Sequence, residues 1–227
     1  MTTYPNSPNH ARAALILMDA STGNYERIIR LQLNPSRLTR SVKSMGASSD
    51  GGDRGEAQRL TGPPRETIQL EAELDAADQL EKPDSHARAV EYGLRPELAA
   101  LERIVYPASE TVESNASLAQ LGMLEVLPAE APLTLFYWGK NRLLPVLVQD
   151  IGVTELAFDQ TLNPILAQVT LSMQVLTSYD LPFGHRGRDL YADHHKLVER
   201  LARPALAFRP GARPLGAILG QLTGRGG

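Results

Sequence analysis

Two segments of the chain, 67–74 and 168–175, alternate strictly between apolar and polar residues. In the first segment the apolar residues are Ile68, Leu70, Ala72 and Leu74, and the polar residues are Thr67, Gln69, Glu71 and Glu73. Successive side chains of a β-strand point to opposite faces of its sheet, so this period of two predicts strands with one buried and one wet face. The carboxylates of Glu71 and Glu73 are therefore expected to face water.

Further β-type runs flank these segments. Residues 14–18 and 26–33 are apolar-rich and are separated by a cluster of turn formers, which predicts an N-terminal hairpin. Residues 37–43 alternate again after Asn34 and Pro35, where proline biases the preceding residue towards an extended conformation. Beyond residue 131 the chain returns to β-type sequence in four runs, 132–139, 141–153, 154–159 and 164–177.

Residues 75–106 have a helical period instead. Their apolar positions include Leu80, Ala87, Val90, Leu94, Leu98, Leu101 and Val105. Ser85 is expected to cap a helix, and Gly93 to divide the helical part into two pieces. A polar stretch over 107–117 then leads to a short apolar segment over 118–127. Strands, then helices, then strands predict a mainly β, α+β domain with a helical insertion at about 75–127.

Two segments hold too few apolar residues to form a packed unit. Residues 44–64 are rich in Gly, Ser and Pro, so we expect a long mobile loop that becomes ordered on a partner. Residues 185–227 carry eight Arg or Lys and three acids, a balance of +5 beside −8 for the rest of the chain. We expect one domain over 1–180 and a basic, Gly/Pro-rich extension over 181–227, with a helix near 189–203, that docks on an acidic neighbour.

Composition narrows the classes of function. The chain has 227 residues and a formal charge of −3, so no overall positive field draws it to nucleic acid. No stretch approaches the ~20 apolar residues that a membrane-spanning helix needs. The absence of Cys excludes disulfides, thiol nucleophiles and Cys-based zinc sites. We expect neither a nucleic-acid partner nor a membrane span.

Candidates for catalysis or metal binding are few. No G-x-S-x-G motif is present, the histidines lie away from the strand-rich segments, and the glycines of 46–55 match no phosphate-binding loop. His195 and Glu199 are one helical turn apart, but the neighbouring His194 would diverge from His195 by about 100° around a helix. We therefore expect no catalytic residue, no metal and no cofactor, and a structural protein rather than an enzyme.

Short motifs follow one another in a fixed order between residues 13 and 177. They are LQLNPS, which ends at Ser36, PLTLFYWG from Pro132 to Gly139, TELAFD with Phe158, the run Leu162-Asn163-Pro164, and the alternating AQVTLSM. In this order and spacing the chain resembles the tube-related baseplate family of phage-tail-like contractile injection systems. It departs from the family pattern at four positions. Leu33 stands where the family usually has an aromatic residue, and Ala131-Pro132 stands in place of a double proline. Glu155 and Leu162 stand where the last turn of the family has Tyr and Gly.

The resemblance implies a phage tail-tube-like antiparallel β-sandwich or barrel and a structural role. It implies a ring, a homohexamer, that joins the spike complex to the first layer of the inner tube. The implied partners are further copies of the chain, the spike protein, the inner tube protein and other baseplate subunits. Such a particle assembles in the bacterial cytoplasm and is either released or retained. Family members often carry a LysM module, which is not recognisable after Tyr179. The alternative is a soluble β-barrel that binds a small ligand or is an enzyme of unknown substrate.

These considerations select one set of candidate interface residues. They are Asn34, Pro35, Glu71, Glu73, Trp138, Gly139, Phe158, Arg203, Arg209 and Arg213. The motifs supply five of them, the polar face of 67–74 supplies two, and the basic extension supplies the arginines. Trp138 either fills the core or lies at an interface. The polar face lines either a wet lumen or an outer surface.

Overall fold

The computed structural model describes residues 12–19, 22–31, 35, 37–46, 60–107, 109–120, 122 and 132–205. One compact unit extends to His194, and a second begins at His195. The strands and the helical insertion belong to the first unit, and the described part of the second is the remainder of one helix. Residues 47–59, most of the expected loop, lie outside the described residues.

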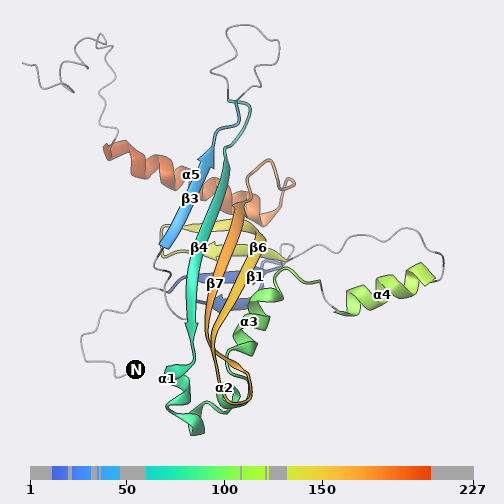
Figure 1. Ribbon diagram of the computed structural model, residues 1–227. Coiled ribbons are helices and arrows are strands. Elements are labelled where there is room, and N and C mark those ends of the chain that lie inside the picture. Colours follow the sequence, from blue (N-terminus) through green and yellow to red (C-terminus); the bar gives the residue numbers. More distant parts are fainter. Residues whose placement is uncertain are drawn as a thin grey trace, which may run out of the picture. The chain divides into compact units, whose positions relative to one another are not determined.

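Seven antiparallel strands form one open sheet in the described chain (Figure 1). They are β1 (Ala14–Met18), β2 (Tyr25–Arg30), β3 (Arg37–Lys43), β4 (Arg65–Asp75), β5 (Leu133–Tyr137), β6 (Leu143–Phe158) and β7 (Pro164–Val175). Their order across the sheet is β2-β1-β5-β6-β7-β4-β3, so β2 and β3 form its two edges. The predicted mainly β, α+β fold and the N-terminal hairpin of β1 and β2 are confirmed.

Strand β6 connects two halves of this sheet. Its first residues pair with β5, and from Val146 onward it pairs with β7. The ladder shifts register between Val148 and Asp150, and such bulges bend a strand. Side chains from β1 and from β4 consequently belong to the same buried cluster, which includes Leu15 and Leu70. The runs 141–153 and 154–159 were expected as separate strands, but they are one strand, because Asp150 and Gly152 at their junction remain paired with β7.

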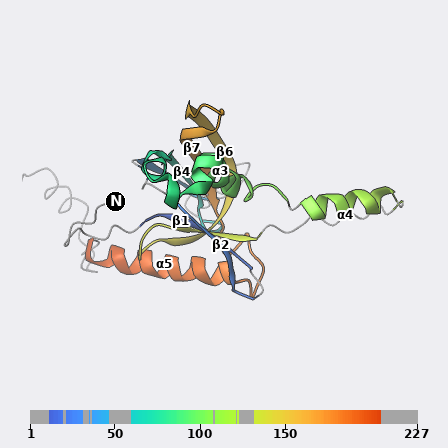
Figure 2. The ribbon, with the colours of Figure 1, turned by 90° about the horizontal axis from the view of Figure 1, so that it is seen from below.

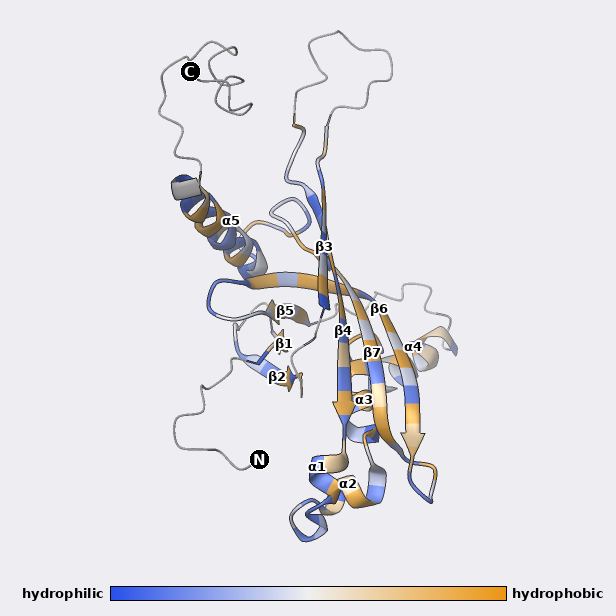
Figure 3. Ribbon diagram, turned by 60° about the vertical axis from the view of Figure 1, so that its left-hand side comes forward, coloured by the Kyte–Doolittle hydropathy of each residue, from blue (hydrophilic) through white to orange (hydrophobic). Residues whose placement is uncertain are grey.

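The alternation predicted for β4 and β7 is confirmed by burial. The apolar residues Ile68, Leu70, Ala72 and Leu74 are at most 3% exposed. They lie directly opposite Met173, Leu171, Val169 and Ala167 of β7, which are at most 1% exposed. Figure 3 shows the result as alternating hydrophilic and hydrophobic bands along the strands. The two strands thus share one apolar face and one polar face.

Short helices make up the insertion and cover the apolar face. They are α1 (Ala77–Leu80), the 3-10 turn η2 (Pro83–Ser85), α2 (Ala87–Tyr92), α3 (Arg95–Glu102) and α4 (Ser109–Gln120). The predicted break at Gly93 is confirmed, because this residue separates α2 from α3 with a φ of 58°. Leu94, Leu98 and Leu101 are buried in the main core. Burying each such side chain stabilises the fold by about 1.5–3 kcal/mol, which fixes α3 on the sheet.

One detail of the insertion differs from the prediction. Ser85 caps no helix, because it lies in the η2 turn and His86 occupies the position before α2. Helix α4 lies within the predicted helical insertion and takes up most of the polar stretch 107–117. Residues 109–120 contain neither Gly nor Pro, so nothing interrupts a helix there, although few of their side chains are apolar.

The other face of β1 and β5 packs against the start of α5 (Arg186–Ala205), the helix expected near 189–203. Met18 and Leu133 form a small buried cluster with Leu190 beside it. Gly187 permits this approach, since a Cβ there would lie 2.8 Å from the Leu181 side chain. Strands β1 and β2 therefore lie between α3 and the first turns of α5 (Figure 2).

Candidate functional site

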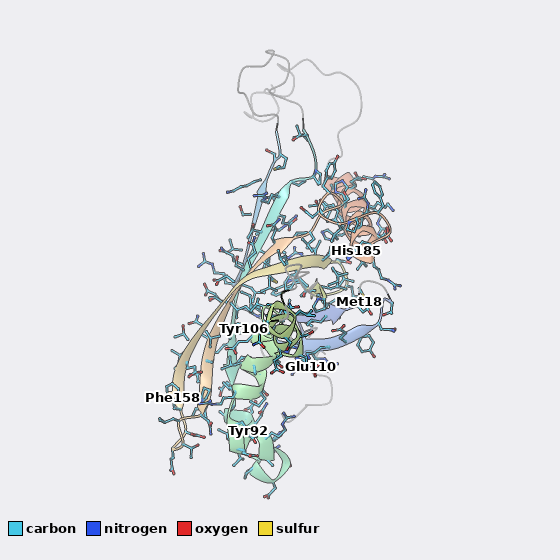
Figure 4. All side chains as sticks on the ribbon, turned by 90° about the vertical axis from the view of Figure 1, so that its right-hand side faces the viewer. Met18, Tyr92, Tyr106, Glu110, Phe158 and His185 are labelled. Atoms are coloured by element: carbon cyan, nitrogen blue, oxygen red, sulfur yellow. The ribbon has the colours of Figure 1, made fainter. Side chains whose placement is uncertain are left out.

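A long polar face extends over β3, β4, β7 and β6. Glu71 and Glu73 are exposed on it, as predicted, together with Gln69. In the cross-strand register, Glu71 lies between Arg37 of β3 and Thr170 of β7. Among the described elements no helix lies over this face, since the insertion occupies the opposite side (Figures 1 and 4).

A shallow hollow occupies the middle of the polar face. Its lining includes Arg37, Gln69, Glu71, Asp150, Thr170 and Ser172. Gly152 makes room for the Thr170 side chain, because a Cβ at position 152 would lie 2.4 Å from the Thr170 hydroxyl. That hydroxyl instead donates a hydrogen bond to the Gly152 carbonyl oxygen at 3.3 Å. Hydroxyls, carboxylates and an amide give the hollow the character of a hydrated surface rather than of an apolar ligand pocket.

Within the described chain, each of the two edge strands of the sheet pairs with a neighbouring strand on one side only. Strand β2 pairs with β1, and strand β3 pairs with β4. An edge strand presents unpaired N–H and C=O groups that template pairing with another chain unless they are covered. The edges are therefore places where a further polypeptide could extend the sheet.

An ion pair fixes the β3 edge to its neighbour. The Arg40 guanidinium donates to both carboxylate oxygens of Glu66, through Nε to Oε1 and through Nη2 to Oε2 at 3.0 Å. The hydrogen bond to Glu66 raises the pKa of Arg40 above its ordinary value. Tyr191 of α5 lies beside the pair, and burial raises the pKa of its phenol. This bidentate pair holds β3 against β4 in register.

The turn between β6 and β7 is closed by a network of side-chain hydrogen bonds. Asp159 Oδ1 accepts from the backbone N–H of Thr161 and of Asn163, each at 2.8 Å. The Asn163 amide donates to Asp159 Oδ2 at 3.0 Å and to the Glu91 carbonyl oxygen of α2 at 3.1 Å. The backbone N–H of Leu94 also donates to the Pro164 carbonyl oxygen at 2.8 Å. The hairpin is thus fixed to the helical insertion.

This network makes the turn sensitive to acid. The backbone hydrogen bond from Asn163, with further bonds from Asn163 and Thr161, lowers the pKa of Asp159 from 3.8 to about 2. A lowered folded-state pKa stabilises the fold above the unfolded value of 3.8, and that stabilisation is lost as pH falls through about 2. We expect the difference in unfolding temperature between the wild type and Asp159→Asn to be constant above this window and to shrink within it. Thermal unfolding followed by circular dichroism across the window measures this, and a difference independent of pH would contradict it.

Leu162, in the same turn, has an uncommon backbone conformation. Its φ is 64°, and it is the one non-glycine residue with positive φ in the described chain. Leucine pays a steric cost for this left-handed conformation, whereas glycine adopts it freely. The side chain is 71% exposed, so packing of the chain's own core does not explain its presence there.

The candidate interface residues lie in several separate places. Pro35 precedes β3, and Phe158 ends β6 with 47% of its surface exposed. Trp138 packs against the main core, with its ring 5.8 Å from that of Phe136, so its position agrees with the core-filling alternative. Gly139 follows it with a φ of 74° in the β5–β6 turn.

The candidates from the basic extension are not brought near these residues by any described contact. Arg203 is exposed on α5 within the second unit. Asn34, Arg209 and Arg213 lie outside the described residues.

The described residues contain no candidate metal site and no candidate membrane-spanning helix. His195 Nε2 lies 3.4 Å from Glu199 Oε1, one turn along α5. Across the described ranges no group of three or more His, Asp or Glu residues is arranged to hold a metal ion. No helix in the part of the chain that the structure describes is long and apolar enough to cross a membrane.

Sequence reasoning missed the Asp159–Asn163 network and its contact with α2. The run Asp-Gln-Thr-Leu-Asn contains Asp, Thr and Asn at alternate positions, and short polar side chains of this kind bond to nearby backbone groups in turns. That signal could have indicated the turn. The contact with Glu91 is 72 residues distant and could not have been found from local sequence.

No protein-family model and no curated protein matches this chain. Its function is therefore inferred from the motif order, the open sheet and the β6–β7 turn.

Proposed function

We propose that the chain is a non-enzymatic baseplate adaptor of a contractile injection system. In this proposal identical copies form a ring, with six members by the family resemblance. The ring joins the spike complex to the first layer of the inner tube. Its partners are the spike protein, the inner tube protein and neighbouring baseplate subunits, in a particle that assembles in the bacterial cytoplasm.

The backbone conformation of Leu162 is the observation that carries the proposal. The motif order places Leu162 where the family pattern has glycine, next to Asn163 and Pro164. Its φ of 64° is the conformation for which glycine is normally selected. A position chosen by motif alignment therefore has the geometry that the aligned glycine would require. This agreement supports the resemblance at the point where the sequence departs from it.

The open sheet supports the same proposal. Edges β2 and β3 lie at opposite ends of the strand order, so the two edges of one chain can meet different neighbours. Contacts between two different patches of identical subunits are heterologous and close into a ring when the rotation permits. Ring formation would cover edges that otherwise favour aggregation. It would also leave the polar face of β4 and β7 available to water.

The conformation of Leu162 leads to a stability prediction. We expect Leu162→Gly to retain or raise the unfolding temperature, because relief of about 1–2 kcal/mol of left-handed strain offsets the entropic cost of glycine. Leu162→Val should lower stability by about 1 kcal/mol or more, because a β-branched side chain tolerates positive φ less well. Chemical denaturation of both variants measures the difference. Equal stability of the Gly and Val variants would contradict the assigned turn.

Affinity purification tests the adaptor proposal. A tagged full-length chain, expressed from its own locus in the bacterium that encodes it, should co-purify with a spike protein and a tube protein. Mass spectrometry identifies the partners, and the same tag on an unrelated protein from that bacterium is the control. Recovery of the chain with neither a spike nor a tube protein would contradict the proposal.

The polar face gives a second test within the same proposal. If Glu71 and Glu73 line the passage through the ring, their charges act on whatever passes along it. We expect Glu71→Lys with Glu73→Lys to leave ring assembly intact and to reduce the loading of cargo. Lys82→Glu with Arg103→Glu, on exposed side chains of the helical insertion, is the charge-reversal control. If the variant with Glu71→Lys and Glu73→Lys loads cargo as well as the wild type, these carboxylates belong to an outer surface instead.

A further inference from the structure

An arginine-rimmed groove lies between the edge strand β2 and the helices of the insertion. Two adjoining hollows share Arg88, Pro96 and Glu97 and together form this groove. Arg27 and Arg30 of β2 lie on its other side and are exposed. We call this surface the arginine groove.

The arginine groove contrasts in charge with the rest of the first unit. Residues 1–184 carry a net charge of −8, yet four arginines, Arg12, Arg27, Arg30 and Arg88, border this one groove. Between them the lining is partly apolar, with Ile28 43% exposed and Ala100 partly exposed. Such a surface fits a partner that presents apolar side chains together with carboxylates.

The tip of the β6–β7 hairpin has these properties. Leu156, Phe158 and Leu162 are 54%, 47% and 71% exposed, and we call them the apolar tip. Glu155 and Asp159 add two carboxylates, and residues 149–163 contain no Lys or Arg. The hydrogen bonds of the turn hold the apolar tip in place before any partner arrives, which reduces the entropic cost of binding.

The apolar tip faces away from the arginine groove of its own chain. Asn163 and Pro164 contact α2 and the start of α3 from the β7 side, while Arg88 and Glu97 line the groove on these same helices. In Figure 4, Phe158 lies on one side of the helices and strands β1 and β2 lie on the other. The two surfaces can therefore meet only between different copies.

We propose that the apolar tip of one copy docks in the arginine groove of a second copy. Glu155 then faces the arginines, and the apolar side chains cover Ile28 and Ala100. The contact joins two different patches, so it propagates from copy to copy and closes into a ring when the rotation allows. The inference rests on the ring of the proposed function, but self-association of the purified chain tests it without spike or tube.

Mixing two variants tests the contact. Arg30→Glu with Arg88→Glu disables the arginine groove, and Glu155→Arg with Phe158→Ser disables the apolar tip. Each variant alone should self-associate at least about tenfold more weakly than the wild type in sedimentation velocity. An equimolar mixture should form one-to-one dimers and no larger species, since one intact tip and one intact groove remain. Lys82→Glu with Arg103→Glu, on two exposed residues that line neither hollow, should associate like the wild type.

Cysteine cross-linking gives a second test of the contact, which does not depend on measuring an affinity. The chain contains no cysteine, so Leu162→Cys combined with Ala100→Cys introduces the only thiols. A short bismaleimide should convert this variant into a ladder of covalent oligomers. Leu60→Cys with Ala100→Cys, in which Leu60 is 74% exposed, should give no ladder. A wild type that stays monomeric and a tip–groove pair that gives no ladder would overturn the contact. Co-purification with spike and tube would still decide the adaptor proposal separately.

Discussion

Gly93→Ala should destabilise the protein by about 3–5 kcal/mol and lower its unfolding temperature by roughly 10 °C. Gly93 has a φ of 58° and a ψ of −131°, a conformation that other residues adopt only under strain. A Cβ would in addition lie 2.4 Å from the Pro164 carbonyl oxygen. That oxygen accepts the backbone N–H of Leu94, so the substitution would separate the helical insertion from the β6–β7 hairpin. Differential scanning calorimetry measures the loss.

Gly139→Ala is the matched control for this prediction. Gly139 also has a positive φ, of 74°, but no heavy atom lies within 4 Å of a Cβ built there. Its substitution therefore carries the conformational cost alone, about 1 kcal/mol. Equal losses at Gly93 and Gly139 would show that the contact with Pro164 contributes nothing to stability.

Strands with one buried face were the part of the fold most accessible from sequence. In β4 and β7 the polarity of each residue decides on which face of the sheet its side chain lies, so the local alternation was sufficient to predict both strands. Helix α4 lies within the predicted insertion, but its bounds could not be predicted because its polar side chains leave no apolar stripe to detect. The continuity of β6 was missed because a bulged strand changes register and breaks the period of two.

Less of the candidate site than of the fold could be predicted from the sequence. Exposure of Glu71 and Glu73 followed directly from the alternation of β4. The β6–β7 turn depends on a hydrogen bond from Asn163 to Glu91, and the arginine groove combines β2 with α2 and α3. Contacts between such distant segments are set by tertiary packing, which no local pattern encodes.

The adaptor proposal predicts that loss of the chain has its largest effect on particle assembly. Forming the first tube layer from free subunits costs translational and rotational freedom for each of them. In the proposal, a ring already fixed on the spike offsets that cost by presenting neighbouring binding surfaces together. Without this chain we expect tube subunits to fail to assemble on the spike, so that joined particles disappear rather than become less frequent. Restoring the wild-type gene should recover them, and restoring it with Gly93→Ala should not do so at temperatures where that variant unfolds.

Electron microscopy of particles from the bacterium that encodes the chain tests the adaptor proposal most directly. Particles are compared from cells with the gene intact, deleted and restored. The proposal predicts full-length sheathed particles, with spike and tube joined, in the intact and restored cells and none in the deletion. Complete particles with a joined spike and tube in the deletion would contradict it.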